Sequence, residues 1–196
     1  MANISSISKG PRQSNFELLK IIAMFLVLIA HADFYSLGTP GQEDFASSPV
    51  NAVTRTVFQA ISIVCVNVFI LISGWFRIRP SLKGFLNLIF QCAFFYGGYY
   101  IIAVVTGYAT LSLGSIVYAL CPDSNGISWF IVAYIALYIL SPILNSFLEN
   151  SSKKQIEIFL VSFYLFQTVY TIYLLTGYIS HGYSPFSFIG LYVLAN

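Results

Sequence analysis

The stretch that decides the fold is FELLKIIAMFLVLIAHADF, residues 16–34. It is apolar over most of its length, but Glu17 and Lys20 lie near its start and His31 lies near its end. An apolar run of nearly 20 residues is typical of a helix that crosses a bilayer. We therefore predict a membrane-spanning helix over residues 16–32 that carries three ionisable side chains.

The composition of the whole chain agrees with a membrane protein. Of its 196 residues, 58% are hydrophobic and only 8% are charged, and the mean hydropathy is +0.80. Soluble domains carry roughly 25% charged residues, so this chain cannot cover itself with a water-facing surface. We expect it to lie in a lipid bilayer. Its net charge of +2 and the absence of a basic run exclude a nucleic-acid partner.

Cysteine and histidine give no sign of a metal site. The cysteines, Cys65, Cys92 and Cys121, form no CxxC pair, so the sequence contains neither a disulfide framework nor a zinc motif. The two histidines, His31 and His181, lack the spacing of metal ligands. We expect no metal and no bound cofactor.

The apolar runs predict an all-α integral membrane protein, a polytopic helical bundle. Five runs are long enough to span a bilayer, and a sixth begins at Phe186. The five predicted spans are residues 16–32, 57–76, 85–107, 128–147 and 156–178. Turn-forming stretches separate them, such as SLGTPGQED from Ser36. We interpret residues 1–196 as a single transmembrane domain with an N-terminal segment, residues 1–15, outside the bilayer.

The positive charges predict the orientation. If the five spans alternate in direction, eight of the nine basic residues fall on one side, which the positive-inside rule assigns to the cytoplasm. Arg55 is the one basic residue that falls on the outer side, where the acidic residue Asp33 also lies. We therefore expect a cytoplasmic N-terminus. The eight inner residues are Lys9, Arg12, Lys20, Arg77, Arg79, Lys83, Lys153 and Lys154.

The three ionisable groups of the first span fall on one helical face. Lys20 and His31 are eleven positions apart, which is three turns plus about 20°, and about 16 Å along the axis. Glu17 precedes Lys20 by three residues and can pair with it. A polar stripe of this kind is expected to face the bundle interior or a wet cavity. An alternative stays open: Glu17 and Lys20 are interface anchors, and His31 extends outward to water.

The first span also resembles a known family. The stretch PRQSNFELLKIIAMFLVLIAHADF is similar to the first helix of the membrane-bound acyltransferase family 3, which includes bacterial O-acetyltransferases of surface polysaccharides. In that family an arginine and a histidine are separated by ten residues; here Lys20 replaces the arginine and His31 matches. Three further stretches resemble family motifs in the family's order: VNVFILISGWFRIRP from Val66, SWFIVAYIALYILSPILN from Ser128 and FSFIGLYVLAN from Phe186.

The resemblance implies a reaction and a donor. Family members move an acyl group, usually acetyl, from cytoplasmic acyl-CoA to a hydroxyl of a saccharide acceptor. It implies that His31 is the general base, with a transient acyl-histidine as an alternative. It also implies that Lys20 stabilises the negative charge of the donor or orients its thioester along the stripe. Arg77 and Arg79 are the expected contacts of the donor phosphates, although the positive-inside rule alone also explains their position.

Three further residues are expected to line the cavity: Glu17, Asn67 and Trp129. Polar side chains such as Asn67 also join membrane helices by hydrogen bonds, which is the alternative for that residue. Family members typically have about ten helices, so the chain resembles the N-terminal half of such an enzyme.

Two other functions stay open on the sequence. One is a transporter or channel segment, in which charged residues within the membrane are also expected, although no inverted repeat is evident. The other is an inactive remnant of an acyltransferase.

Overall fold

The structure is a computed structural model that describes residues 13–120, 129–174 and 184–196. These residues form ten helices and no strand. The chain divides into two compact units, Met1–Ile72 and Ser73–Asn196, and the boundary between them falls within helix α5. Each unit is described by itself.

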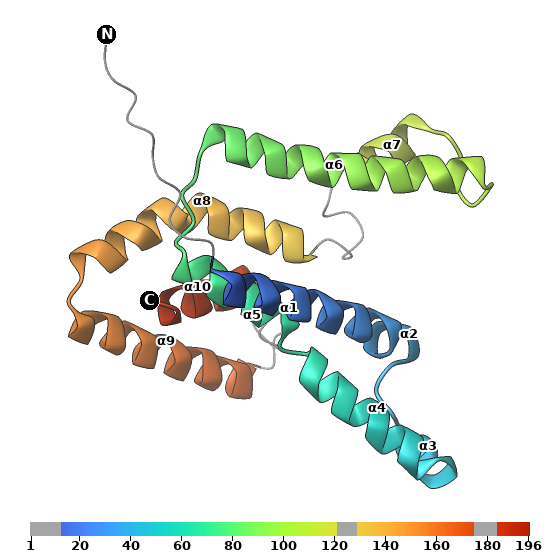
Figure 1. Ribbon diagram of the computed structural model, residues 1–196, viewed down its shortest axis with the longest axis horizontal. Coiled ribbons are helices and arrows are strands. Elements are labelled where there is room, and N and C mark those ends of the chain that lie inside the picture. Colours follow the sequence, from blue (N-terminus) through green and yellow to red (C-terminus); the bar gives the residue numbers. More distant parts are fainter. Residues whose placement is uncertain (1–12, 121–128, 175–183) are drawn as a thin grey trace. The chain divides into compact units, whose positions relative to one another are not determined.

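The first unit is built on helices α1 and α4, which pack against each other. The buried residues of α1 are small, Ala23 and Ala30, and Ala52 on α4 is buried as well. Small side chains allow two membrane helices to approach closely. The helices of this unit are α1 (Ser14–Ala32), α2 (Phe34–Leu37), α3 (Gln42–Ser47), α4 (Pro49–Ser62) and the first part of α5 (Cys65–Trp75), coloured blue to blue-green in Figure 1.

The second predicted span begins earlier than the sequence suggested. Helix α4 starts at Pro49, eight residues before the predicted start at Val57. Proline is well suited to the first position of a helix because its ring fixes φ and its missing N–H has no partner there. The helix is interrupted by a turn at Ile63 and Val64 and continues as α5. A short helix, α3, also occupies part of the predicted SLGTPGQED break.

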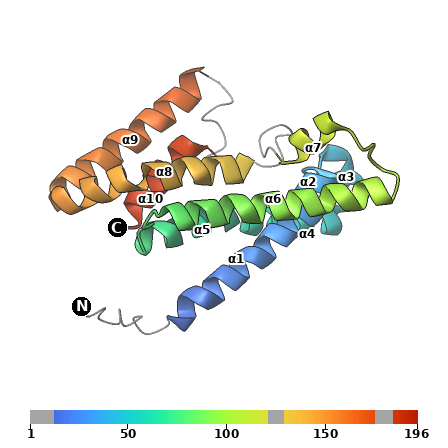
Figure 2. The ribbon, with the colours of Figure 1, turned by 90° about the horizontal axis from the view of Figure 1, so that it is seen from above.

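The second unit has its core around α10. This short helix packs against both α8 and α9, as Figure 2 shows, and its Phe188, Tyr192 and Val193 are completely buried. Leu137 of α8 is also completely buried, and Phe163 of α9 stacks on Phe186 with ring centroids 4.5 Å apart. The helices of this unit are α6 (Leu82–Val105), α7 (Leu113–Leu120), α8 (Trp129–Asn150), α9 (Lys153–Leu174) and α10 (Pro185–Leu194).

Within residues 13–120, 129–174 and 184–196, four helical segments are long and apolar enough to cross a membrane. They confirm the first four predicted spans, with somewhat different ends. The predicted fifth span is helical over Lys153–Leu174, but it is not among these four, and residues 175–178 lie outside the described residues. The count of five complete spans therefore stays a prediction. The four segments are Ser14–Leu37, Pro49–Trp75, Leu82–Val105 and Trp129–Asn150.

The sixth predicted span and the loop before the fourth each contain a short helix. A ten-residue apolar helix, α10, lies where the sixth span was expected to begin. Helix α7, which the sequence did not predict, follows α6 and lies against it. Single-domain organisation and the inward N-terminus stay predictions, and Lys9 and Arg12 lie outside the described residues.

Candidate functional site

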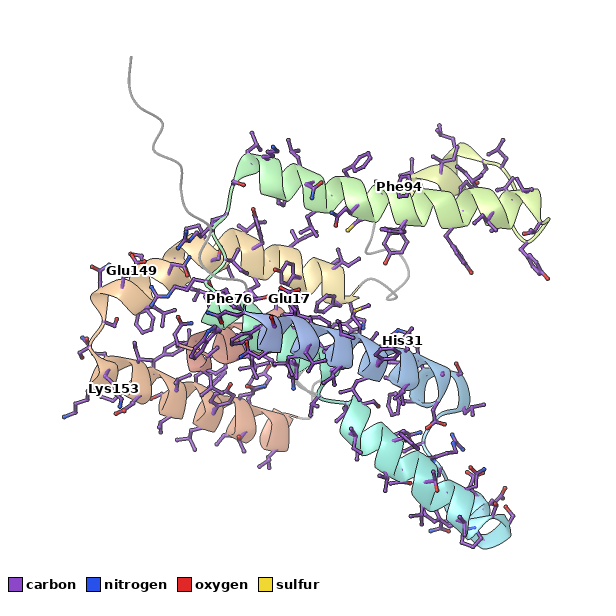
Figure 3. The ribbon with its side chains drawn as sticks, in the orientation of Figure 1. Glu17, His31, Phe76, Phe94, Glu149 and Lys153 are labelled. Carbon is purple, nitrogen blue, oxygen red and sulfur yellow. The ribbon has the colours of Figure 1, made fainter. Side chains whose placement is uncertain are left out.

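Helix α1 confirms that Lys20 and His31 lie on one face. It is continuous from Ser14 to Ala32, so the helical geometry that relates the two residues applies without a break. Glu17 and His31 are marked near the two ends of this helix in Figure 3. The separation of about 16 Å between Lys20 and His31 along the axis follows from the rise per residue. Both residues belong to the first unit.

Glu17 and Lys20 form an ion pair. Lys20 Nζ lies 3.4 Å from Glu17 Oε1, and the two side chains are 42% and 44% exposed. They line one end of an open depression of about 250 Å³, whose other lining residues are Ile21, Met24, Phe25 and Leu28. His31 is three residues beyond Leu28, so the depression runs along α1 from the ion pair toward His31.

The hydrogen bond of His31 defines which ring nitrogen carries the proton. Its Nδ1 lies 2.8 Å from the backbone oxygen of Val27. A carbonyl oxygen can only accept, so Nδ1 must donate. In the neutral ring, Nε2 then holds the free lone pair. The imidazole is exposed, and its ring centroid lies 4.9 Å from that of Tyr35. A neutral imidazole in this tautomer can accept a proton at Nε2.

The polar stripe lies to one side of the contact between α1 and α4. At 100° per residue, Lys20 and His31 point about a quarter of a turn away from the buried Ala23 and Ala30. The expectation that this face lines the interior of a bundle or a wet cavity stays a prediction.

A second polar cluster follows His31 by two residues, and the sequence analysis did not predict it. Arg55 Nε donates to Asp33 Oδ1 over 2.6 Å, and these side chains are only 18% and 17% exposed. Gln59 Nε2 donates to Asp33 Oδ2 over 2.7 Å. Both Arg55 and Gln59 also donate to the carbonyl of Gly38, which has a φ of +73°. The cluster joins the end of α1 and the following turn to α4.

The two arginines after α5 have different surroundings. Arg77 donates from Nε to Asn196 Oδ1 over 2.8 Å and from Nη1 to Glu149 over 3.3 Å. Its φ of +52° lies in the left-handed region, which costs a non-glycine residue about 1–3 kcal/mol. Arg79 is exposed and has no hydrogen bond or ion pair with the described residues. Glu149, near the end of α8, is labelled in Figure 3.

Ile78, which lies between these two arginines in the sequence, is held by hydrogen bonds to its backbone N–H and C=O. The hydroxyl of Tyr192 accepts from Ile78 N over 2.8 Å, and Asn145 Nδ2 donates to Ile78 O over 2.8 Å. Tyr192 in turn donates to Asn145 Oδ1 over 2.7 Å. The three stretches that contain Ile78, Asn145 and Tyr192 were each singled out in the sequence, but their mutual contact could not be predicted.

Gly74 explains how α5 and α10 meet. A Cβ atom at this position would lie 2.6 Å from the carbonyl oxygen of Tyr192 and 2.9 Å from Cβ of Ala195. Only glycine allows such a close approach of two backbones. Asn196 Nδ2 completes the contact by donating to the carbonyls of both Gly74 and Tyr192 over 3.0 Å.

Comparison with protein families identifies the chain. The profile of the acyltransferase 3 family, described as an acyltransferase domain, matches residues 13–195. The chain belongs to the acyltransferase 3 family. No curated protein and no solved structure gives a significant match.

The family assignment covers both units, and the predicted site residues of this acyltransferase divide between them. Glu17, Lys20, His31 and Asn67 belong to the first unit, and Arg77, Arg79 and Trp129 belong to the second. Asn67 Oδ1, on α5, is buried and has no hydrogen-bond partner among the residues that the structure describes. Trp129, at the start of α8, packs near Phe188 with ring centroids 6.4 Å apart. The roles of all seven residues stay predictions.

Proposed function

We propose that this acyltransferase moves an acyl group, most simply acetyl, from cytoplasmic acyl-CoA to a hydroxyl of a cell-envelope or exported polysaccharide. Membership of the acyltransferase 3 family supports acyl transfer, and the apolar helices support an integral membrane protein. The positive-inside pattern supports location in the cytoplasmic membrane with the N-terminus inside.

His31 is the general base of the proposed reaction. Its Nε2 accepts the proton of the acceptor hydroxyl while the oxygen attacks the thioester carbonyl, so a C–O bond forms and the C–S bond breaks. The proton then passes from Nε2 to the departing thiolate, which leaves as CoA. The observation that carries this assignment is the Nδ1 hydrogen bond to Val27, because it leaves Nε2 free to accept. A transient acyl-imidazole on Nε2 is the alternative route from the same atom.

Lys20 has a different task because it lies about 16 Å from His31 along the helix. At that distance its ammonium group does not share a carbonyl with the imidazole. It instead orients the anionic donor at the cytoplasmic end of the stripe. Lysine lacks the planar fork of the arginine typical of the family, so it contacts the donor as a point charge. Glu17 holds the ammonium group until the donor arrives.

Arg77 and Arg79 are the proposed contacts of the donor phosphates, since guanidinium groups bind phosphate oxygens in a bidentate manner. Arg79 is exposed and uncommitted. Arg77 is paired with Glu149, but this pair is long and its carboxylate is 63% exposed. Such pairs contribute little free energy, so a phosphate group can replace the carboxylate.

The experiment that tests the proposal is a transfer assay in inverted membrane vesicles. The chain is expressed with any coding sequence that continues beyond Asn196, and acetyl-CoA labelled in the acetyl group is added outside the vesicles. We expect label to appear in the saccharide fraction, released by mild base as an ester is. Saccharide uptake that does not depend on acyl-CoA, without labelled product, would instead indicate a transporter.

A further inference from the structure

The segment between α5 and α6 is fixed by its backbone on both sides of Arg79. Upstream of Arg79, the N–H and C=O of Ile78 bind Tyr192 and Asn145. Downstream, the N–H and C=O of Ser81 both bind the hydroxyl of Tyr138, over 2.9 and 3.1 Å. Proline at position 80 further restricts Arg79 to an extended backbone.

The side chain of Arg79 contrasts with this fixed backbone. It is exposed and has no partner among the described residues. The next residue in the sequence, Pro80, lines an open depression of about 470 Å³. The other lining residues of this depression are Ser81, Leu82, Phe85, Tyr138 and Ile139. A cation with a fixed backbone and an uncommitted head group is pre-organised for an anion, since less freedom is lost on binding.

The hydroxyl of Tyr192 is the central atom of this arrangement. The side chain is completely buried, and its hydroxyl both accepts from Ile78 and donates to Asn145. Asn145 uses both ends of its amide, one toward Tyr192 and one toward Ile78. The left-handed backbone of Arg77 comes immediately before this contact. Strained residues of this kind persist where surrounding contacts hold them, and they gather at functional sites.

We propose that Tyr192 and Asn145 are positioning residues for the acyl donor: by binding both backbone groups of Ile78, they hold Arg79 in place to bind the phosphates of the nucleotide half of CoA. The proposal rests on the proposed function. It places the selectivity for the donor in α8 and α10, away from the residues that carry out the chemistry.

The variants that test it are Tyr192→Phe and Asn145→Leu, which remove hydrogen bonds and keep most of the side-chain volume. Tyr164→Phe is the matched control, because the hydroxyl of Tyr164 in α9 is buried and has no hydrogen-bond partner within the described parts of the chain. Two quantities are measured on detergent-solubilised protein. The first is the Kd of adenosine bisphosphate, the nucleotide half of CoA. The second is KM and kcat with acetyl-CoA and with acetyl-pantetheine, which lacks that half.

We expect Tyr192→Phe and Asn145→Leu each to raise the Kd of the nucleotide and the KM of acetyl-CoA about 2- to 10-fold. We expect kcat to change less than about twofold and acetyl-pantetheine to react as before, because a positioning role affects only the phosphate contacts. In an Arg79→Ala background, Tyr192→Phe should have no further effect on Kd. Tyr164→Phe should change none of these values.

An unchanged nucleotide Kd in both variants would overturn the positioning role. So would an equal loss with both donors, which would indicate general damage to the fold. Failure of the wild-type protein to bind the nucleotide would overturn it as well. A wild-type protein that binds the nucleotide but transfers no acetyl group would contradict the proposed function and leave the binding test of the positioning role intact.

Discussion

Arg55 Nε, on α4, donates to Asp33 Oδ1 over 2.6 Å, and Asp33 follows His31 by two residues. Gln59 supports the same carboxylate, and both donors also bind the carbonyl of Gly38. These bonds connect the end of α1 to α4 with little exposed charge. Asp33 is the residue that follows α1, so the cluster lies immediately after the helical turn that carries His31.

The Asp33–Arg55 pair predicts an asymmetry between single and double variants. Arg55→Leu leaves the carboxylate of Asp33 without its cation and should lower the Tm in detergent. The double variant Asp33→Leu, Arg55→Leu removes both charges and should unfold at a higher temperature than Arg55→Leu, because an unpaired charge costs more than a missing pair. Equal Tm values for the two variants would contradict the structural role of this pair.

Gly74 predicts a steric effect with a control on a neighbouring helix. In Gly74→Ala the new methyl group would lie 2.6 Å from the Tyr192 carbonyl oxygen, and overpacking of this kind costs about 1–3 kcal/mol. In Gly98→Ala nothing lies within 4 Å of the new atom, and a helix interior gains about 0.5–1 kcal/mol from this change. Thermal unfolding should therefore shift in opposite directions for the two variants. A stable Gly74→Ala protein would show that α5 and α10 do not meet as described.

Periodicity and charge predicted much of the fold. Four of the predicted spans are helices long and apolar enough to cross a membrane, and they could be predicted because a lipid-facing helix must be apolar over its whole length. The early start of α4 was missed because Asn51, Thr54 and Arg55 interrupt the apolar pattern there. Arg55 is partly buried by its bond to Asp33, a contact between residues far apart in the sequence. Helical spacing contains no information about such contacts.

The candidate site could be predicted only along one helix. The common face of Lys20 and His31 follows from the spacing alone, whereas the hydrogen bond from Nδ1 of His31 depends on the orientation of its ring, which the spacing does not contain. The three motif stretches around Ile78, Asn145 and Tyr192 were visible in the sequence. Their contact depends on α8 and α10 packing together, which a single sequence does not reveal.

Glu149 predicts a gain of donor affinity. Its carboxylate oxygen lies 3.3 Å from Nη1 of Arg77 and pairs with this guanidinium group. A donor phosphate is proposed to bind the same group. Glu149→Gln removes the competing charge and should lower the KM of acetyl-CoA about 2- to 5-fold, since exposed pairs contribute up to about 1 kcal/mol. The matched control is Glu157→Gln, whose carboxylate pairs with Lys153 at 3.9 Å. A higher KM in Glu149→Gln would show that this carboxylate supports the arginine instead of competing for it.

Lys20 predicts a difference between two substitutions. Lys20→Arg restores the residue that the family motif contains and should keep or improve kcat/KM, because the planar fork adds bidentate contacts. Lys20→Gln removes the charge and should lower kcat/KM for acetyl-CoA about 10- to 100-fold. Steady-state kinetics in inverted vesicles would measure both. If Lys20→Gln reacts like the wild type, the ammonium group does not contact the donor.

The most direct test of the central claim is the turnover number of His31→Ala. A general base contributes about 10²–10⁴-fold to the rate, so kcat for acetyl transfer should fall by that factor while membrane insertion and Tm stay unchanged. His181→Ala, which alters the chain's other histidine, should keep the wild-type kcat. A His31→Ala protein that transfers acetyl groups at the wild-type rate would contradict the account.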